Sequence, residues 1–125
     1  MQHSQILENY QLEEINMEKI TIAGKVHTLP FPVKYKIESV NYILFIVKPL
    51  GNVFFSENVF MFDSKGNYLW QISREIVDRH KSDEYTYFVD GKFDLKENVI
   101  LWNWDGWKIT VNSATGEELS YEFTK

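Results

Sequence analysis

The sequence predicts a mainly β domain: an antiparallel meander of roughly eight to ten strands, closed as a barrel or packed as a sandwich, with at most one short helix near residues 74–81. Short apolar or alternating runs are separated by Gly, Pro, Asn and Asp, which favour turns. Aromatic residues make up 16% of the chain and suit the pleated, half-buried surface of a sheet. The 125 residues are expected to form a single β-rich domain over residues 1–125.

The first third of the chain predicts an arm followed by short strands. Residues 1–17 carry a poor helical stripe, and we expect a flexible or helical N-terminal arm there. Residues 20–29 alternate on both sides of Gly24, which predicts two strands around a glycine turn. Pro30 and Pro32 then predict an extended corner, because proline fixes its own φ and keeps the preceding residue out of the helical region.

The middle of the chain predicts the centre of a sheet. Residues 33–37 alternate as a half-exposed strand, whereas residues 42–47 are apolar throughout and should be buried on both faces. Residues 59–72 read as a hairpin in which Gly66 takes the left-handed position of a type I turn with a G1 bulge. Regular alternation would then place four aromatic side chains on one face: Phe60, Phe62, Tyr68 and Trp70.

A short helix should follow Ser73, whose hydroxyl is a suitable N-cap. We expect a strand over residues 85–89, and a second tight turn at Asp90 and Gly91. Residues 119–123 alternate apolar and polar, which predicts a one-sided strand at a sheet edge that faces water.

Residues 99–111 predict a hairpin closed by a two-residue turn of Asp105 and Gly106, with type I′ geometry. That turn would set three cross-strand pairs and place three tryptophans on one face of the sheet: Trp104 with Trp107, Trp102 with Ile109, and Ile100 with Val111. The predicted core of the domain draws on this hairpin and on the central strands: Leu44, Phe45, Ile46, Phe60, Phe62, Leu69, Trp70, Ile100, Trp102, Ile109 and Val111.

Charge and composition exclude several classes of function. The formal net charge is −5, and the few basic residues are not clustered, which argues against binding to nucleic acid or to an anionic membrane and suits a basic protein partner. No apolar run approaches the length of a transmembrane helix, and the first residues do not resemble an export signal, so we expect a cytoplasmic protein. The absence of cysteine excludes disulfides and thiolate metal sites.

No catalytic motif is recognisable, and we predict no enzymatic activity, no cofactor and no metal. His3 lies in the expected N-terminal arm, and His27, beside Thr28 in a predicted strand, is read as a structural or exposed histidine rather than a catalytic base. Asp78, His80 and Asp83 are spaced as a weak metal site, but Arg79 and Lys81 between them would repel a cation, so a solvated charged loop is the preferred reading.

The aromatic side chains allow three readings: core residues, a stacking platform for a sugar or another flat ligand, or an interface with a partner. If some are exposed, the candidate ligand or partner contacts are Trp102, Trp104, Trp107, Tyr85 and Tyr87.

Two hairpins, over residues 59–72 and 109–123, form a weak internal repeat. The first, with Phe62, Asp63, Gly66, Leu69 and Trp70, resembles the outer hairpin of a β-propeller blade of the pyrroloquinoline-quinone-dehydrogenase-like type. The resemblance implies hairpins only, because a propeller needs about four blades of four strands and this chain is too short to supply them.

The order of motifs also resembles small bacterial β-rich proteins, some of them similar to immunity partners of secreted toxins. The matching residues are 29–32, 40–49, 62–72, 103–106 and 115–116. The resemblance implies a non-enzymatic interaction protein, an immunity-type inhibitor that binds a basic partner. Two alternatives remain open: a small-ligand-binding β-barrel with an aromatic cavity, and a homodimer formed through the edge strand 119–123.

Overall fold

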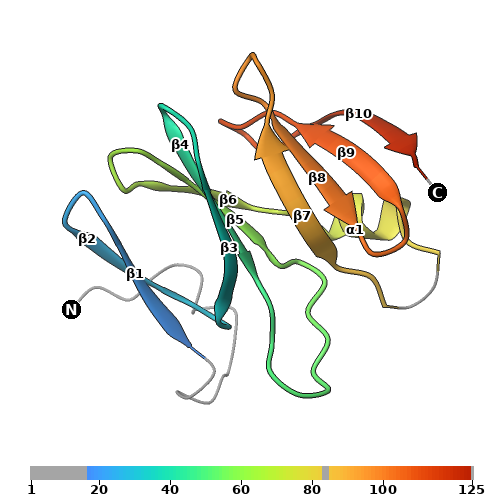
Figure 1. Ribbon diagram of the computed structural model, residues 1–125, viewed down its shortest axis with the longest axis horizontal. Coiled ribbons are helices and arrows are strands. Elements are labelled where there is room, and N and C mark those ends of the chain that lie inside the picture. Colours follow the sequence, from blue (N-terminus) through green and yellow to red (C-terminus); the bar gives the residue numbers. More distant parts are fainter. Residues whose placement is uncertain (1–16, 83–84, 125) are drawn as a thin grey trace.

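The computed structural model describes residues 17–82 and 85–124, which fold into ten strands and one short helix (Figure 1). The expected N-terminal arm, apart from Met17, lies outside the described residues. The elements are β1 (Glu18–Ile22), β2 (Lys25–Leu29), β3 (Val33–Glu38), β4 (Tyr42–Val47), β5 (Val59–Asp63), β6 (Tyr68–Gln71), α1 (Arg74–Arg79), β7 (Phe88–Phe93), β8 (Val99–Asn103), β9 (Trp107–Val111) and β10 (Glu118–Phe123).

The strands form three antiparallel sheets that follow the order of the chain. Sheet A is the β1–β2 hairpin, sheet B has the order β3-β4-β5-β6, and sheet C has the order β10-β9-β8-β7. Figure 1 shows sheet A on one side of sheet B and sheet C on the other. The predicted antiparallel meander with one short helix is therefore confirmed, and of the two expected architectures the described residues show packed sheets and no closed barrel.

Sheet B is buried on both faces, as the apolar run 42–47 predicts. One face of β4 and β5 packs with sheet C, the other with sheet A, because alternate side chains of a strand point to opposite faces. The core between sheets B and C contains Leu44, Ile46, Val59, Met61, Trp70, Ile72, Ile76, Val77, Phe88, Val99, Leu101, Ile109 and Val111. The core between sheets A and B contains Ile20, Ile22, Leu29, Phe31, Ile43, Phe45, Val47, Phe60 and Phe62.

The β5–β6 hairpin has the predicted turn but not the predicted faces. Gly66 has a φ of 89°, and its N–H donates to the carbonyl of Asp63. The register shifts between Met61 and Phe62, which is a β-bulge. Trp70 therefore lies opposite Met61, on the face toward sheet C, so the expectation that it shares a face with Phe60 and Phe62 is wrong.

The β8–β9 hairpin is shifted by one residue from the predicted register. Trp102 lies opposite Lys108 rather than Ile109, and Trp104 belongs to the turn. Gly106 has the expected positive φ of 95°, but Asp105 does not share it, so the two-residue type I′ turn is wrong. Asn103 makes the longer turn favourable, because its side-chain carbonyl accepts a hydrogen bond of 2.9 Å from the N–H of Trp107.

That shift exchanges the two faces of β8, whereas Ile109 and Val111 of β9 remain on the buried face as predicted. Val99 and Leu101 are fully buried between the sheets, whereas Ile100 and Trp102 point away from the core and are half-buried. Leu69 is also only half-buried. The prediction that Ile100, Trp102 and Leu69 are core residues is therefore wrong. The other eight predicted core residues are buried: Leu44, Phe45, Ile46, Phe60, Phe62, Trp70, Ile109 and Val111.

The tight turn predicted at Asp90 and Gly91 is also wrong, since both residues lie inside β7, which begins at Phe88 rather than at residue 85. A Cβ atom on Gly91 would meet the Cδ2 atoms of Leu44 and Leu101 at 3.1 and 3.2 Å. Glycine is therefore needed here because sheets B and C approach closely, and not because the chain turns.

Helix α1 confirms the expected N-cap, since the Ser73 hydroxyl accepts a hydrogen bond from the N–H of Ile76. Ile76 and Val77 are buried against the sheets. The predicted edge strand at the C-terminus is confirmed as β10, whose single neighbour in the described part of the chain is β9.

Candidate functional site

Two stacked aromatic pairs lie at the end of the sandwich where β4 ends and β7 begins. Phe54 stacks on Tyr85 with ring centroids 4.5 Å apart, and Tyr87 stacks on Trp104 at 5.9 Å. Tyr85 and Tyr87 precede β7 in an extended segment, and the N–H of Trp104 donates to the carbonyl of Tyr87. We call these four side chains the aromatic end.

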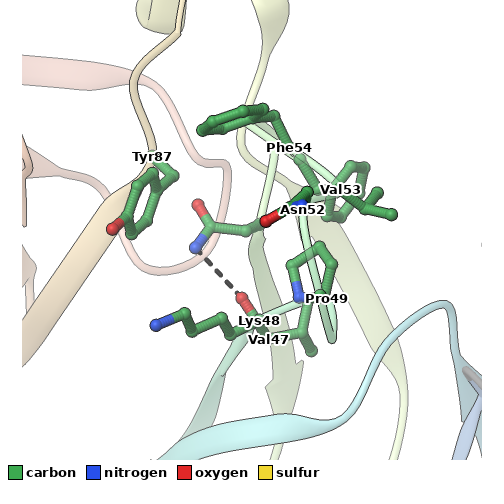
Figure 2. Close-up of a pocket in the computed structure, with 10 residues that line it drawn as sticks. Val47, Lys48, Pro49, Asn52, Val53, Phe54 and Tyr87 are labelled. Atoms are coloured by element: carbon green, nitrogen blue, oxygen red, sulfur yellow. Dashed lines mark hydrogen bonds between the residues drawn. The ribbon is translucent and has the colours of Figure 1, made fainter.

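A pocket of about 180 Å³ opens beside the aromatic end, and two of its four side chains, Phe54 and Tyr87, line it. Figure 2 shows Tyr87 and Phe54 on either side of it, with Lys48 and Pro49 below. The pocket is close to the roughly 150 Å³ that accommodates benzene and below the roughly 300 Å³ at which pockets for drug-sized molecules begin. It therefore has the size of one side chain.

Asn58 forms the floor of the pocket and ties the two sheets together there. Its side-chain amide donates to the carbonyls of Val47 (3.1 Å) and Phe88 (2.8 Å), and its side-chain carbonyl accepts from the N–H of Phe88 (2.9 Å). Asn58 is only 1% exposed, so these bonds form away from water. A buried amide with its hydrogen bonds made holds the end of β4 against the start of β7.

The surface around the pocket is apolar and open to solvent. Phe54 is 59% exposed and Trp104 is 60% exposed. The loop that carries Phe54 adds two more exposed aliphatic side chains, Leu50 and Val53. Apolar residues that gather on one exposed surface indicate a binding site, whereas scattered ones do not.

The structure brings together three of the five aromatic residues that the sequence singled out: Tyr85, Tyr87 and Trp104. Trp102 lies apart from them on the outer face of sheet C, where the Lys92 ammonium lies 5.8 Å from its ring. Trp107 is half-buried near the sheet edge, where it contacts His80, Tyr121 and Phe123.

Phe54 and Asn58 belong to the site and were missed by the sequence reasoning. Their segment follows Pro49, Gly51 and Asn52, which mark a loop, so the Val-Phe-Phe run inside it was the available signal. An apolar run within a loop is a candidate for exposure, because loops run over the surface.

The opposite end of the sandwich is held by Glu97 in place of Asn58. The Glu97 carboxylate accepts hydrogen bonds from the Ser39 hydroxyl (2.6 Å) and from the backbone and side-chain N–H groups of Asn41 (2.9 and 2.7 Å). The Ser39 hydroxyl and the Asn41 donors stabilise the charged form and lower the pKa of Glu97. Glu97 has a φ of 62°, a conformation that is costly for a residue with a side chain.

The two described histidines lie apart, and neither belongs to a group of three potential metal ligands in the described residues. His80 is buried and bonds Glu118, which also pairs with Arg79. His27 contacts the carbonyl of Gly66. The chain as described holds no group of three potential metal ligands, although His3 and Asp83 lie outside it.

No helix among residues 17–82 and 85–124 is long and apolar enough to span a bilayer. Comparison with curated proteins gave no match, and comparison with solved structures gave none either. A family model does match, and it covers residues 11–123, which include every strand of the fold. The chain therefore belongs to the family described as a domain of unknown function, DUF7957.

Proposed function

We propose that this protein is a non-enzymatic interaction protein that binds a basic protein partner through its aromatic end. The observation that carries the proposal is the pocket of about 180 Å³ between the exposed ring of Phe54 and the half-buried ring of Tyr87, each stacked on a second aromatic ring. Aromatic side chains are enriched in the few residues that dominate the affinity of protein interfaces. A single apolar or aromatic side chain of the partner is the occupant that this volume suits.

The charge of the chain supports a basic partner. The sequence has 18 acidic and 13 basic residues, which gives the net charge of −5. A field of this sign accelerates the encounter with a positively charged surface, and salt screens it. Lys48 lines the pocket itself, so the basic groups of the partner belong around the pocket and the inserted side chain should be uncharged.

An immunity-type inhibitor of a secreted toxin is the form of this function that the resemblance to small bacterial proteins suggests. In that case the toxin would be the basic partner. The alternative of a barrel with an internal ligand cavity loses its basis, because the sheets of the described chain pack on each other.

Selection from a displayed random peptide library tests the proposal and does not require that the partner be identified first. We expect the selected peptides to share one apolar or aromatic residue flanked by Lys or Arg. Their affinity should fall when salt is raised from about 50 to about 500 mM, because screening weakens the charge term. Isothermal titration calorimetry would measure how the affinity depends on the flanking Lys or Arg residues and on the salt concentration.

Variants of the aromatic end locate the site. Tyr87→Ala and Phe54→Ala should each weaken peptide binding about tenfold or more, as expected for residues at the centre of an interface. Trp102→Ala is the matched control, since it removes an aromatic ring from a different face, and it should change the affinity less than about twofold. Peptides that bind all three variants equally well, or a selection that yields none, would overturn the proposal.

A further inference from the structure

The four outer strands of sheets B and C differ in how their free edges are protected. An exposed edge invites another strand to pair with it, and proteins commonly block this with lysines and bulges. Strand β3 carries Lys34 and Lys36 and has a register shift, and it also contacts β7 of the neighbouring sheet. Strand β10 also has a register shift, between Glu118 and Ser120, but it has neither lysine nor proline over Glu118–Phe123.

Three of the six side chains of β10 are apolar and open to solvent. Leu119 is 50% exposed, Tyr121 59% and Phe123 51%. Figure 1 shows β10 at the outer edge of sheet C, on the side away from sheets A and B. Tyr121 and Phe123 pack against Trp107, and Tyr121 also packs against His80, yet both rings stay more than half exposed, so an added strand would bury part of them.

Among the symmetric pairings centred on Ser120, Tyr121 or Glu122, which pair most of β10 with a second copy of itself, charge favours one. In an antiparallel pair related by a two-fold axis perpendicular to the sheet, one residue lies opposite its own equivalent. An axis at Ser120 would place Glu118 opposite Glu122, and an axis at Glu122 would place that residue opposite itself. Both arrangements bring like charges together, which is destabilising. An axis at Tyr121 pairs the two tyrosines and places each Glu122 opposite a Ser120.

We propose that two copies of this chain associate through β10, with the two-fold axis at Tyr121. The pairing joins the two copies of sheet C into one continuous sheet and brings the Tyr121 rings together, an arrangement that stabilises antiparallel strands. This interface does not involve the pocket or the four side chains of the aromatic end, so it is independent of the proposed function.

Sedimentation equilibrium measures the association. We expect a species of twice the 14.9 kDa chain mass at high protein concentration. Tyr121→Asp should shift the protein to the monomer, because it places two carboxylates on the axis. Tyr35→Asp is the matched control, as it adds the same charge to the exposed edge strand β3, and it should leave the dimer intact. Circular dichroism of both variants confirms that they fold.

Cysteine crosslinking tests the register, and the absence of native cysteine makes each introduced thiol unique. Tyr121→Cys should form an intermolecular disulfide on mild oxidation, because opposed residues have Cα atoms about 4.5 to 5.5 Å apart. Ser120→Cys alone should not, since its equivalents would be about 8 Å apart, but it should crosslink when mixed with Glu122→Cys.

The salt dependence of the dimer distinguishes this association from binding to a basic partner. Two copies each carry a charge of −5, so added salt should strengthen the dimer, whereas it should weaken binding at the aromatic end. A chain that stays monomeric at all concentrations and salt levels, a dimer that survives Tyr121→Asp, or efficient crosslinking of Ser120→Cys alone would overturn the inference.

Discussion

Asn58 and Glu97 perform the same task at opposite ends of the sandwich, with different chemistry. Each makes three side-chain hydrogen bonds and joins sheet B to sheet C: two of the Asn58 bonds reach Phe88 of sheet C, and all three Glu97 bonds reach the turn between β3 and β4 of sheet B. Asn58 is a buried neutral amide, whereas Glu97 is a carboxylate whose bonds to Asn41 are exposed. The buried link lies under the pocket and the exposed aromatic rings, whereas the exposed link joins two turns. The buried link thus supports the end that we propose to bind a partner.

The comparison predicts its largest effect for Asn58→Ala. The substitution leaves the carbonyl of Phe88 and its N–H without their buried partner, and unsatisfied buried groups cost about 1–3 kcal/mol each. We expect the free energy of unfolding to fall by about 3 kcal/mol, measured by urea denaturation. A loss below about 1 kcal/mol would show that water replaces the amide and that the buried hydrogen bonds of Asn58 contribute little to stability.

Gly91 tests the packing between the two links. Gly91→Ala places a methyl group 3.1 and 3.2 Å from the Cδ2 atoms of Leu44 and Leu101, both of which are fully buried. Overpacking of this kind costs about 1–3 kcal/mol, and we expect about 2 kcal/mol by the same denaturation measurement. An unchanged stability would mean that the sheets separate readily, and the two end links would then be the main determinants of their spacing.

Gly106 positions Trp104 at the aromatic end. Gly106→Val places a β-branched side chain at a φ of 95° and should cost more than about 1 kcal/mol. The melting temperature measures the effect. An unchanged value would contradict the positive φ and the turn that carries Trp104.

Glu97→Gln should have the smallest effect at neutral pH and a distinct pH dependence. The folded-state pKa of Glu97 is lowered by the Ser39 hydroxyl and the Asn41 donors, so its contribution to stability is present above the unfolded-state pKa of about 4.5. That contribution is lost as the pH falls through the folded-state pKa. The difference in melting temperature between wild type and Glu97→Gln should therefore shrink below about pH 4.5.

The same difference at pH 3 and pH 7 would contradict that assignment. Asp63 serves as an internal reference, because its pKa is also lowered: burial raises it, but hydrogen bonds from Asn67 and Lys65 outweigh that effect. Acid destabilisation through Asp63 remains in both proteins, so the difference between them reports Glu97 alone.

The sequence predicted hairpins well and their registers less well, for a physical reason. A glycine marks where φ turns positive, and both Gly66 and Gly106 do so. The number of residues before the glycine depends on competing hydrogen bonds, such as the one that Asn103 accepts from Trp107. A one-residue difference exchanges the faces of a strand, which is why Trp102 was misplaced and Leu101 missed.

The candidate site was predictable in part. Tyr85, Tyr87 and Trp104 stood out as aromatic residues beside turns and charged segments. Their partner Phe54 lies 31 residues before Tyr85 in the chain, and Asn58 lies 30 residues before Phe88. Contacts at such separations depend on how two sheets pack, and no local pattern encodes that.

Acrylamide quenching of Trp fluorescence, with and without a selected basic peptide, tests directly whether the aromatic end binds a partner. Trp104 is exposed, Trp70 is buried, and Trp102 and Trp107 are half-buried. Quenching of the free protein should come mainly from Trp104 and should drop in Trp104→Phe. We expect bound peptide to protect Trp104 from acrylamide and high salt to restore the quenching, because salt weakens binding of the peptide. Unchanged quenching of Trp104 at a peptide concentration that saturates the protein would contradict binding at the aromatic end.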